Sequence, residues 1–318
     1  MPRSVLLALL AGLGGCATPV LNHRYPPLGE FVEVEGQRLH LVDGGPQAAT
    51  GDPAPALPPL LLVHGSNSNL RDFEASIAPL LREHTRVISI DRPGFGHSPR
   101  HRGAWRNPAE QARLLLAAAA QRGVERPVIL GHSWGGSVAM AALVEHPERV
   151  RGAVLLSGVA GHWAGAPDFK HRLGGWPLLG PAFAHTLLWP LGSLLLEDAI
   201  GDVLAPNPVP TNYTERIAAP LALRGGTFLA NARDMRELSE WMQELSPRYR
   251  EITQPLLLVH GEADTLVPWW NHGQRVLPVV ASARAELLPG VGHSPHHAAP
   301  EAVAGLLLDW LRGVDPAR

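Results

Sequence analysis

Cysteine and lysine are nearly absent from this chain. Cys16 is the only cysteine, so no disulfide can form within one molecule. Lys170 is the only lysine, and 27 basic residues against 29 acidic ones leave a net charge of −2. A chain without a basic excess lacks the electrostatic signature of nucleic-acid binding, so we expect no nucleic-acid partner. The 318 residues, 45% hydrophobic and 18% charged, suit one large domain or one domain with an insertion.

The N-terminus has the pattern of an export signal. Arg3 precedes the apolar run VLLALLAGLGG, which ends in small residues directly before Cys16. This run is too short to cross a bilayer, which needs roughly 20 apolar residues. The segment Leu13–Ala17, LGGCA, resembles a bacterial lipobox, in which cleavage before the cysteine leaves its thiol to be acylated. We therefore expect a signal peptide over residues 1–15 and a lipidated tether over residues 16–29.

The same segment predicts where the protein resides. An acylated Cys16 would hold the protein on a membrane of the bacterial cell envelope. Because Ala17 rather than an aspartate follows the cysteine, we expect the outer membrane if the cell is Gram-negative. If the lipobox is not used, the export signal predicts a secreted or periplasmic protein. The alternative is a buried N-terminal helix with an incidental cysteine.

From residue 30 onward the hydrophobic pattern is typical of an α/β protein. FVEVEGQRLHLVDGG alternates apolar and polar residues around Glu35 and Gly36, as in a hairpin with one buried face. Continuous apolar runs then alternate with helical segments, which predicts a mostly parallel sheet covered on both faces. The predicted strands span residues 60–65, 86–91, 127–133, 152–158, 255–261 and 285–290. One helix carries end signals, with Asn107 as N-cap, Pro108 in its first position and Gly123 at its end.

An insertion is expected between two late strands. About ninety residues separate strands 152–158 and 255–261, far more than a simple crossover needs. Leu173–Leu196 contains no Asp, Glu, Lys or Arg and is long enough for a membrane span, but the three prolines within it disfavour one regular helix. We therefore expect an apolar helical cap over the sheet, in which large side chains such as Leu178 and Leu194 are buried.

The pentapeptide GHSWG, Gly131–Gly135, fits the pattern G-x-S-x-G. It follows the apolar strand PVIL and precedes the helix-prone GGSVAMAALVEH. At such an elbow the serine takes a strained backbone conformation that exposes its hydroxyl above the sheet, and small flanking residues relieve the crowding. Ser133 is therefore a candidate nucleophile. The alternative is a small residue where a strand turns into a helix.

Partners for such a serine follow later in the chain. A serine hydroxyl is a poor nucleophile unless a base removes its proton and an acid orients that base. Asp264 follows the strand that ends in LLLVHG, and His293 follows the last strand, in LLPGVGHSPHH. Ligand sites of open α/β sheets gather just past the carboxyl ends of strands, where all three side chains are expected. Ser133, Asp264 and His293 are the predicted catalytic residues.

Attack on an acyl carbonyl also needs hydrogen-bond donors for the oxyanion that forms. The backbone amide of Trp134, next after the nucleophile, would supply one donor. The amide of Ser66, in the loop after the strand LLLVHG at residues 60–65, would supply the second. Gly65 would let that loop approach the substrate closely.

Taken together, these motifs resemble the α/β-hydrolase superfamily of the serine-nucleophile type, across about residues 30–312. The matching stretches are HGSN at 64–67, DRPGFGHS at 91–98, GHSWGG at 131–136, HGEADTLVP at 260–268 and GVGHSPHH at 290–297. The chain order Ser133, Asp264, His293 is the order that this fold uses. The resemblance implies a mostly parallel, doubly covered sheet of the α/β-hydrolase fold, a cap between two late strands, and a hydrolase.

The predicted reaction is hydrolysis of a carboxylic ester through an acyl-enzyme intermediate. Haloalkane dehalogenases and epoxide hydrolases of this superfamily place an aspartate where this chain has Ser133. Carbon–carbon bond hydrolases usually have a tryptophan directly after the catalytic histidine, where this chain has Ser294. A carbon–carbon bond hydrolase, an amidase or a peptidase stays an alternative, as does a non-catalytic binding protein on the same fold.

The remaining predictions concern the pocket, cofactors and domain limits. We expect Trp269, Trp176 and Trp189 to line a pocket for the apolar portion of a small-molecule substrate. Sixteen histidines are present, but without an H-E-x-x-H helix or a Cys/His pairing the sequence predicts no metal site and no cofactor. Asp91 is expected to anchor a loop through hydrogen bonds. The predicted limits are 1–15 signal peptide, 16–29 tether, 30–160 first part of the core, 161–250 cap and 251–318 second part of the core.

Overall fold

A computed structural model of the chain describes residues 17–46, 57–101, 105, 107–165 and 168–314. Cys16 and the predicted signal peptide lie outside the described residues. Eight strands form one sheet in the order β1-β2-β4-β3-β5-β6-β7-β8. They are β1 (Glu30–Val34), β2 (Gln37–Gly44), β3 (Leu60–Val63), β4 (Val87–Ile90), β5 (Val128–His132), β6 (Gly152–Leu156), β7 (Leu256–Gly261) and β8 (Ala283–Leu288).

The sheet confirms the predicted strand pattern. The strands from β3 to β8 run parallel, and only β1 with β2 and β2 with β4 are antiparallel. Each predicted strand end lies within two residues of the observed one. The predicted hairpin turns at Glu35 and Gly36, whose φ angles of 52° and 72° suit a tight two-residue turn.

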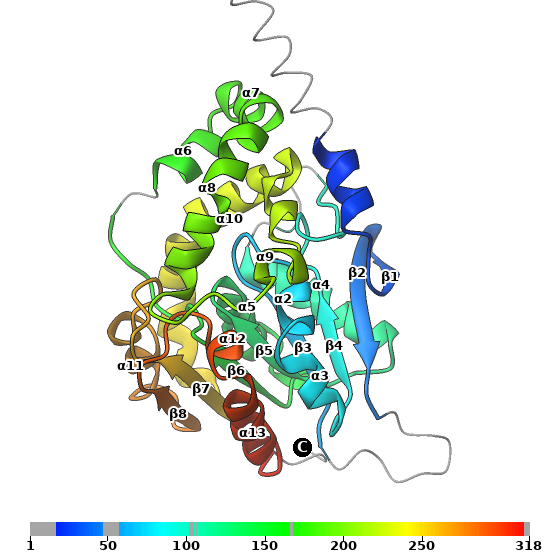
Figure 1. Cartoon of the computed structure of the whole chain (residues 1–318). Helices are drawn as coiled ribbons and strands as arrows, with labels where there is room; N and C mark the ends of the chain where they lie inside the picture. Colours follow the sequence, from blue (N-terminus) through cyan, green and yellow to red (C-terminus); the bar gives the residue numbers. More distant parts are fainter. Residues whose placement is uncertain (1–16, 47–56, 102–104, 106, 166–167, 315–318) are drawn as a thin grey trace, which may run out of the picture.

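Helices cover both faces of this sheet (Figure 1). One apolar core joins the sheet to α4 (Pro108–Gln121) and α5 (Trp134–Glu145), and a second joins it to α3 (Ile77–Arg82) and α13 (Pro300–Leu311). The ends of α4 are as predicted: the Asn107 side chain accepts a hydrogen bond of 2.7 Å from the Glu110 amide, and Gly123 follows the helix with a φ of 75°. The α/β-hydrolase fold is therefore confirmed.

The predicted helical cap lies between β6 and β7 and covers one end of the sheet (Figure 1). It consists of α6 (Phe169–Gly174), α7 (Leu179–Thr186), α8 (Leu188–Leu204), α9 (Tyr213–Arg216), η2 (Ala219–Leu223) and α10 (Gly225–Leu245), and η3 (Ser246–Glu251) leads back to the sheet. Among the described residues no single helix is long and apolar enough to span a membrane. The pair α7 and α8 passes that test together, by length and composition alone, but is bent by 72°.

The expectation that large apolar side chains of the cap are buried was wrong. Leu178 is 84% exposed, Leu194 77% and Trp176 42%. These side chains therefore lie on the surface of the cap. An uncharged apolar stretch indicates that its side chains favour burial, but it does not show whether the rest of the molecule covers them.

Candidate active site

Ser133 lies at the sharp turn between β5 and α5. Its φ of 51° and ψ of −119° are unusual for a residue with a side chain, and such strain costs on the order of 1–3 kcal/mol. Both flanking glycines are sterically required. A Cβ on Gly131 would lie 2.1 Å from the Gly135 carbonyl oxygen, and a Cβ on Gly135 would lie 2.2 Å from the Val63 carbonyl oxygen. The elbow therefore holds the partly exposed Ser133 in place.

Asp264 and His293 form a buried hydrogen-bonded pair. Nδ1 of His293 lies 2.8 Å from Oδ2 of Asp264, and the other carboxylate oxygen accepts hydrogen bonds of 2.9 Å from the amides of Leu266 and Val267. Asp264 follows β7 and His293 follows β8, so neighbouring parallel strands bring them together. With Nδ1 donating to the carboxylate, Nε2 of a neutral His293 is left as a proton acceptor.

The surroundings of Asp264 keep its carboxyl ionised. Burial alone would raise its pKa, but the hydrogen bond and the charge of His293, together with the amide of Val267, outweigh burial and hold the pKa below its usual value. A permanent negative charge beside Nδ1 would stabilise an imidazolium at His293 if that ring took up a proton.

Two contacts bring this pair and the loop after β3 to Ser133. Nε2 of His132, the residue before the serine, lies 3.0 Å from the His293 carbonyl oxygen. On the other side, the backbone at Gly65 lies so close that a Cβ there would be 2.9 Å from the Cβ of Ser133. The structure therefore brings the predicted nucleophile, the His293 loop and the loop of Ser66 together at one edge of the sheet.

Asn231, which no sequence motif marks, fixes the loop of Ser66. Its side-chain oxygen accepts hydrogen bonds from the Ser66 hydroxyl at 2.7 Å and from the Asn67 amide at 3.0 Å. Asn231 lies on α10, so a helix of the cap holds the loop that approaches the nucleophile. No local motif marks it, because its partners lie more than 160 positions earlier in the chain.

Arg92 supports the same loop from beneath. Its fully buried guanidinium donates to the carbonyl oxygens of His64 at 3.0 Å and Gly65 at 2.9 Å. Asp234, also on α10, pairs with Arg92 at 2.9 Å, and the guanidinium lies over the Trp134 ring at 4.0 Å. A buried charge is stable only when it is paired and hydrogen-bonded, which these contacts achieve.

The neighbouring Asp91 anchors loops, as predicted. Its carboxylate accepts hydrogen bonds from the backbone amides of Leu70 at 2.8 Å and His97 at 2.7 Å, and it contacts Nδ1 of His40 at 2.7 Å. These partners come from three separate segments of the chain. Asp91 therefore joins them and makes no contact of its own with Ser133 among those described.

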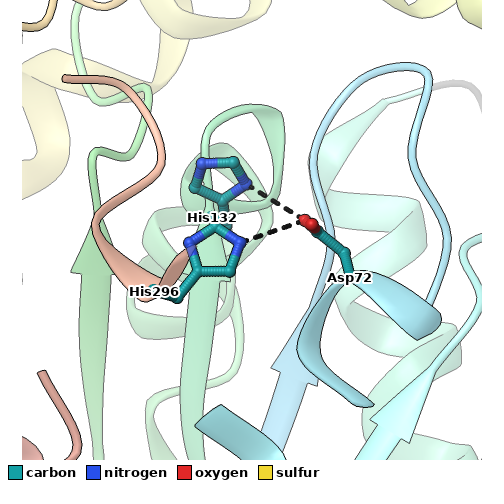
Figure 2. A group of neighbouring side chains, drawn as sticks. All are labelled: Asp72, His132 and His296. Atoms are coloured by element: carbon teal, nitrogen blue, oxygen red, sulfur yellow. Dashed lines mark ion pairs between the residues drawn. The ribbon is translucent and has the colours of Figure 1, made fainter. Parts of the chain in front are cut away.

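A second group of ionisable side chains lies beside the elbow. Asp72 on α2 (Arg71–Glu74) faces the rings of His132 and of His296 on α12 (Pro295–Ala298), as Figure 2 shows. Oδ2 of Asp72 lies 3.6 Å from Nδ1 of His132 and 3.2 Å from Nε2 of His296, and neither nitrogen has a hydrogen bond within the described part of the chain. The other carboxylate oxygen contacts Nε2 of His297 at 2.7 Å.

Asp72, His132 and His296 are the only set among the described residues that could offer a metal ion three close ligand atoms. Burial lowers the pKa of His132 and of His296, so both rings are neutral near pH 7. Burial would raise the pKa of Asp72, but the neighbouring histidines hold it well below its usual value.

The three predicted pocket tryptophans lie in different surroundings. Trp269, in η4 (Trp269–Asn271), packs against the ring of His260 at a centroid distance of 5.3 Å, close to Asp264. Trp176 lines a hollow on the cap, and Trp189 packs against Leu21 and its neighbours. Only Trp269 is thus placed next to the acid loop by a described contact.

The chain is similar to known proteins of one family. A family model described as "Alpha/beta hydrolase family" matches residues 60–306. Haloalkane dehalogenase 2 of Mycobacterium tuberculosis is 35% identical over 131 residues, which are 41% of this chain and only 42% of that protein. Pimeloyl-(acyl-carrier protein) methyl ester esterase of Yersinia enterocolitica is 29% identical over 267 residues, which are 79% of this chain and 92% of that protein.

Solved structures show the same architecture. The crystal structure of an α/β-hydrolase-fold protein from Burkholderia ambifaria superposes with a TM-score of 0.72 and 25% sequence identity. The match covers 89% of this chain and 97% of that one. The sheet and the cap are therefore both part of what the two proteins share.

Proposed function

The chain belongs to the alpha/beta hydrolase family, and from this premise we propose that it is a serine hydrolase that cleaves carboxylic esters. The observation that carries the proposal is the buried hydrogen bond of 2.8 Å between His293 and Asp264, next to a serine on a strained elbow. Nucleophilic catalysis by serine needs this combination of an exposed hydroxyl, a base and an acid that orients the base.

The proposed reaction has two stages. Oγ of Ser133 attacks the ester carbonyl while Nε2 of His293 takes the hydroxyl proton. The carbon–oxygen bond to the alcohol then breaks, and the imidazolium gives its proton to the departing alcohol. Water attacks the acyl-enzyme in the same way, with His293 again as base, and the acid is released. Asp264 keeps the ring oriented and stabilises its charged form throughout.

The backbone amides of Trp134 and Ser66 are the proposed donors to the oxyanion. Trp134 follows the nucleophile at the start of α5, and Ser66 follows Gly65, whose backbone lies against Ser133. Donors that are fixed before the reaction stabilise the developing charge most effectively, and each is worth about 10²–10³ in rate. The contacts of Asn231 and Arg92 supply that fixation.

Two features favour an ester over the other substrates of the family. Ser133 stands where dehalogenases and epoxide hydrolases carry aspartate, and Ser294 stands where carbon–carbon bond hydrolases usually carry tryptophan. Relatives that align over more than nine-tenths of their own length include a methyl ester esterase at 29% identity and a 2-hydroxymuconate semialdehyde hydrolase at 24% identity, so the choice of an ester rests on these two residues. We propose a small-molecule ester with an apolar portion as the substrate.

Covalent labelling tests the nucleophile. A fluorophosphonate probe should label the wild-type chain once, at Ser133, and Ser133→Ala should not be labelled. Ser137→Ala, one turn along the same helix, is the matched control and should be labelled like the wild type. Equal labelling of wild type and Ser133→Ala, or no labelling of the folded wild type, would refute the mechanism.

A turnover panel tests the substrate class. Purified protein should hydrolyse p-nitrophenyl and methyl esters, and Ser133→Ala should not. Amides and vinylogous 1,5-diketones, the substrates of peptidases and carbon–carbon bond hydrolases, should react far more slowly. A preference for either of these would keep Ser133 as nucleophile and replace the ester proposal.

We also propose that the chain is exported and acylated at Cys16. Radiolabelled palmitate should appear on the wild type in cells and be absent from Cys16→Ser, which is a clean comparison because no other cysteine exists. An unlabelled wild type that fractionates with soluble proteins would overturn the anchor and leave the ester proposal untouched.

A further inference from the structure

The exposed apolar side chains of this molecule gather on one part of the cap. In the described part of the chain, eight of the fifteen large hydrophobic side chains that are exposed lie within residues 169–203, a stretch of 35 residues in a chain of 318. Seven of them, named here the cap face, are Phe169, Trp176, Leu178, Leu179, Leu191, Leu194 and Leu195. Scattered exposed leucines need no explanation, but a concentration of this kind marks an interaction surface.

The cap face spans three helices in contact with one another. Leu191, Leu194 and Leu195 are spaced three and four residues apart, so they lie on one side of α8. Leu178 and Leu179 begin α7, which contacts both α6 and α8. The bend of 72° between α7 and α8 prevents them from forming a single spanning helix, so such a surface could rest on a bilayer but could not cross it as one rod.

Basic residues border the cap face on one side. Lys170 and Arg172 are exposed on α6. Arg233 and Arg236 on α10 line a hollow of about 360 Å³ together with Trp176 and apolar residues of α7 and α10. Within the apolar stretch Leu173–Leu196 there is no Asp, Glu, Lys or Arg, but exposed carboxylates adjoin the cap face as well: Asp168 lies directly before α6, and Glu197 and Asp198 follow on α8. The border of the cap face thus carries charges of both signs, and its basic side, on α6 and α10, is the part that would meet lipid phosphates.

The N-terminal segment lies at the same end of the molecule. The helical segment over residues 17–24, drawn in blue, lies at the cap end of the molecule in Figure 1, across the cap from α6 and far from α13. Leu21 and Tyr25 pack against Ala218 and Leu221, and Trp189 of α8 packs against that cluster. The first described residues of the chain thus lie at the cap end of the molecule, where Val20 adds another apolar side chain that is 59% exposed.

We propose that the cap face docks on the surface of a phospholipid bilayer. The leucines enter the boundary between headgroups and acyl chains, and the basic side of the border contacts the phosphates. The edge of the molecule that carries residue 17 then faces the same membrane. This proposal does not depend on ester hydrolysis by Ser133 or on acylation of Cys16.

Vesicle flotation tests the docking surface. The full chain carrying Cys16→Ser, which removes acylation, is mixed with phosphatidylcholine vesicles with and without phosphatidylglycerol. Adding Leu178→Gln and Leu194→Gln should weaken binding to the anionic vesicles about tenfold or more. The matched control, Val279→Gln with Leu287→Gln, changes two exposed apolar residues outside the cap and should bind like the parent.

Vesicle binding also tests the role of charge, and light scattering tests for self-association. Lys170→Glu with Arg172→Glu should weaken binding to phosphatidylglycerol vesicles and leave binding to pure phosphatidylcholine unchanged. Circular dichroism and a melting temperature close to that of the parent show that each variant is folded, so the docking test does not rely on ester turnover. The docking proposal is overturned if the leucine variant binds vesicles like the parent, or if light scattering shows that the substitutions only dissociate a dimer.

Discussion

Asp264 offers the most direct test of the proposed mechanism at the scale of one residue. Asp264→Asn keeps the shape of the side chain but removes the charge that orients and stabilises the imidazole of His293. We expect kcat for ester hydrolysis to fall by about 10³–10⁴ with the fold intact. Glu262→Gln, an exposed neighbour on the same loop, is the matched control and should keep wild-type turnover. A loss of less than tenfold in Asp264→Asn would exclude the proposed role.

Asn231 tests whether the cap positions the loop of Ser66. Asn231→Leu removes the acceptor of two hydrogen bonds, so we expect kcat to fall about tenfold or more while KM changes little. Asn231→Asp keeps a side-chain oxygen for both donors and should recover much of the rate. If both variants lower only the melting temperature, Asn231 is purely structural.

The histidines around Asp72 lead to a prediction about metal removal. The proposed reaction uses a hydroxyl, an imidazole and backbone amides, so it needs no ion. Ester turnover should therefore be unchanged after treatment with EDTA and 1,10-phenanthroline. A different outcome would assign the group in Figure 2 as a metal site: chelators remove the activity, zinc restores it, and Asp72→Asn prevents that restoration.

The residues proposed as catalytic have local signals in the sequence, whereas the residues that support their loops have none. Ser133, Asp264 and His293 each carry a local signal, because each follows an apolar strand within a short motif. Asn231 and Asp234 carry none. Their roles depend on how α10 packs against the loops of Ser66 and Arg92, from which they are separated by more than 140 positions in the chain. Only tertiary packing creates those contacts.

At the scale of elements, the β5–α5 turn and helix α8 give opposite expectations for the same substitution. Gly135→Ala would place a methyl group 2.2 Å from the Val63 carbonyl oxygen, so we expect a loss of several kcal/mol, on the order of 3 or more, and little folded protein. Gly201→Ala on α8 meets nothing within 4 Å and should raise the free energy of unfolding by about 0.5–1 kcal/mol. Urea denaturation measures both. Equal effects would contradict the steric account.

The elements of the core were easier to predict than those of the cap. Continuous apolar runs between turn residues located six of the strands. A strand that is buried on both faces needs apolar side chains at nearly every position, so its sequence is easy to recognise. In the cap the apolar residues are distributed around the helices, and the pattern alone does not separate a buried side from an exposed one. Pro181 and Pro190 lie in the first turns of α7 and α8, where proline is tolerated, so they mark where helices begin.

At the scale of the whole molecule, buried histidines set how stability depends on pH. Burial lowers the pKa of His64, His171 and His272 from 6.5 to about 4. Unfolding lets each take up a proton near its ordinary pKa, so their contribution is complete above about pH 6.5. It is lost as the pH falls toward 4, by roughly 1.4 kcal/mol per pH unit for each group.

Melting temperatures measured from pH 8 to pH 4.5 should therefore be level near pH 7–8 and fall steeply below about pH 6.5. His272→Asn should reduce that slope, whatever it does to the stability at pH 8. His84→Gln, at an exposed position, should leave the slope unchanged. A melting temperature that stays constant down to pH 5 would show that these rings are not held neutral.

The contacts of Asn231 and Asp234 with the loops of the core limit what the cap can do. An outward movement of α10 would break the hydrogen bond of Asn231 with Ser66 and the ion pair of Asp234 with Arg92. We therefore expect substitutions that detach α10 from these loops to disturb the site more than substitutions on α6 to α8. For the same reason, engineers who exchange caps between relatives to alter selectivity would need to transplant α10 together with the β3 loop.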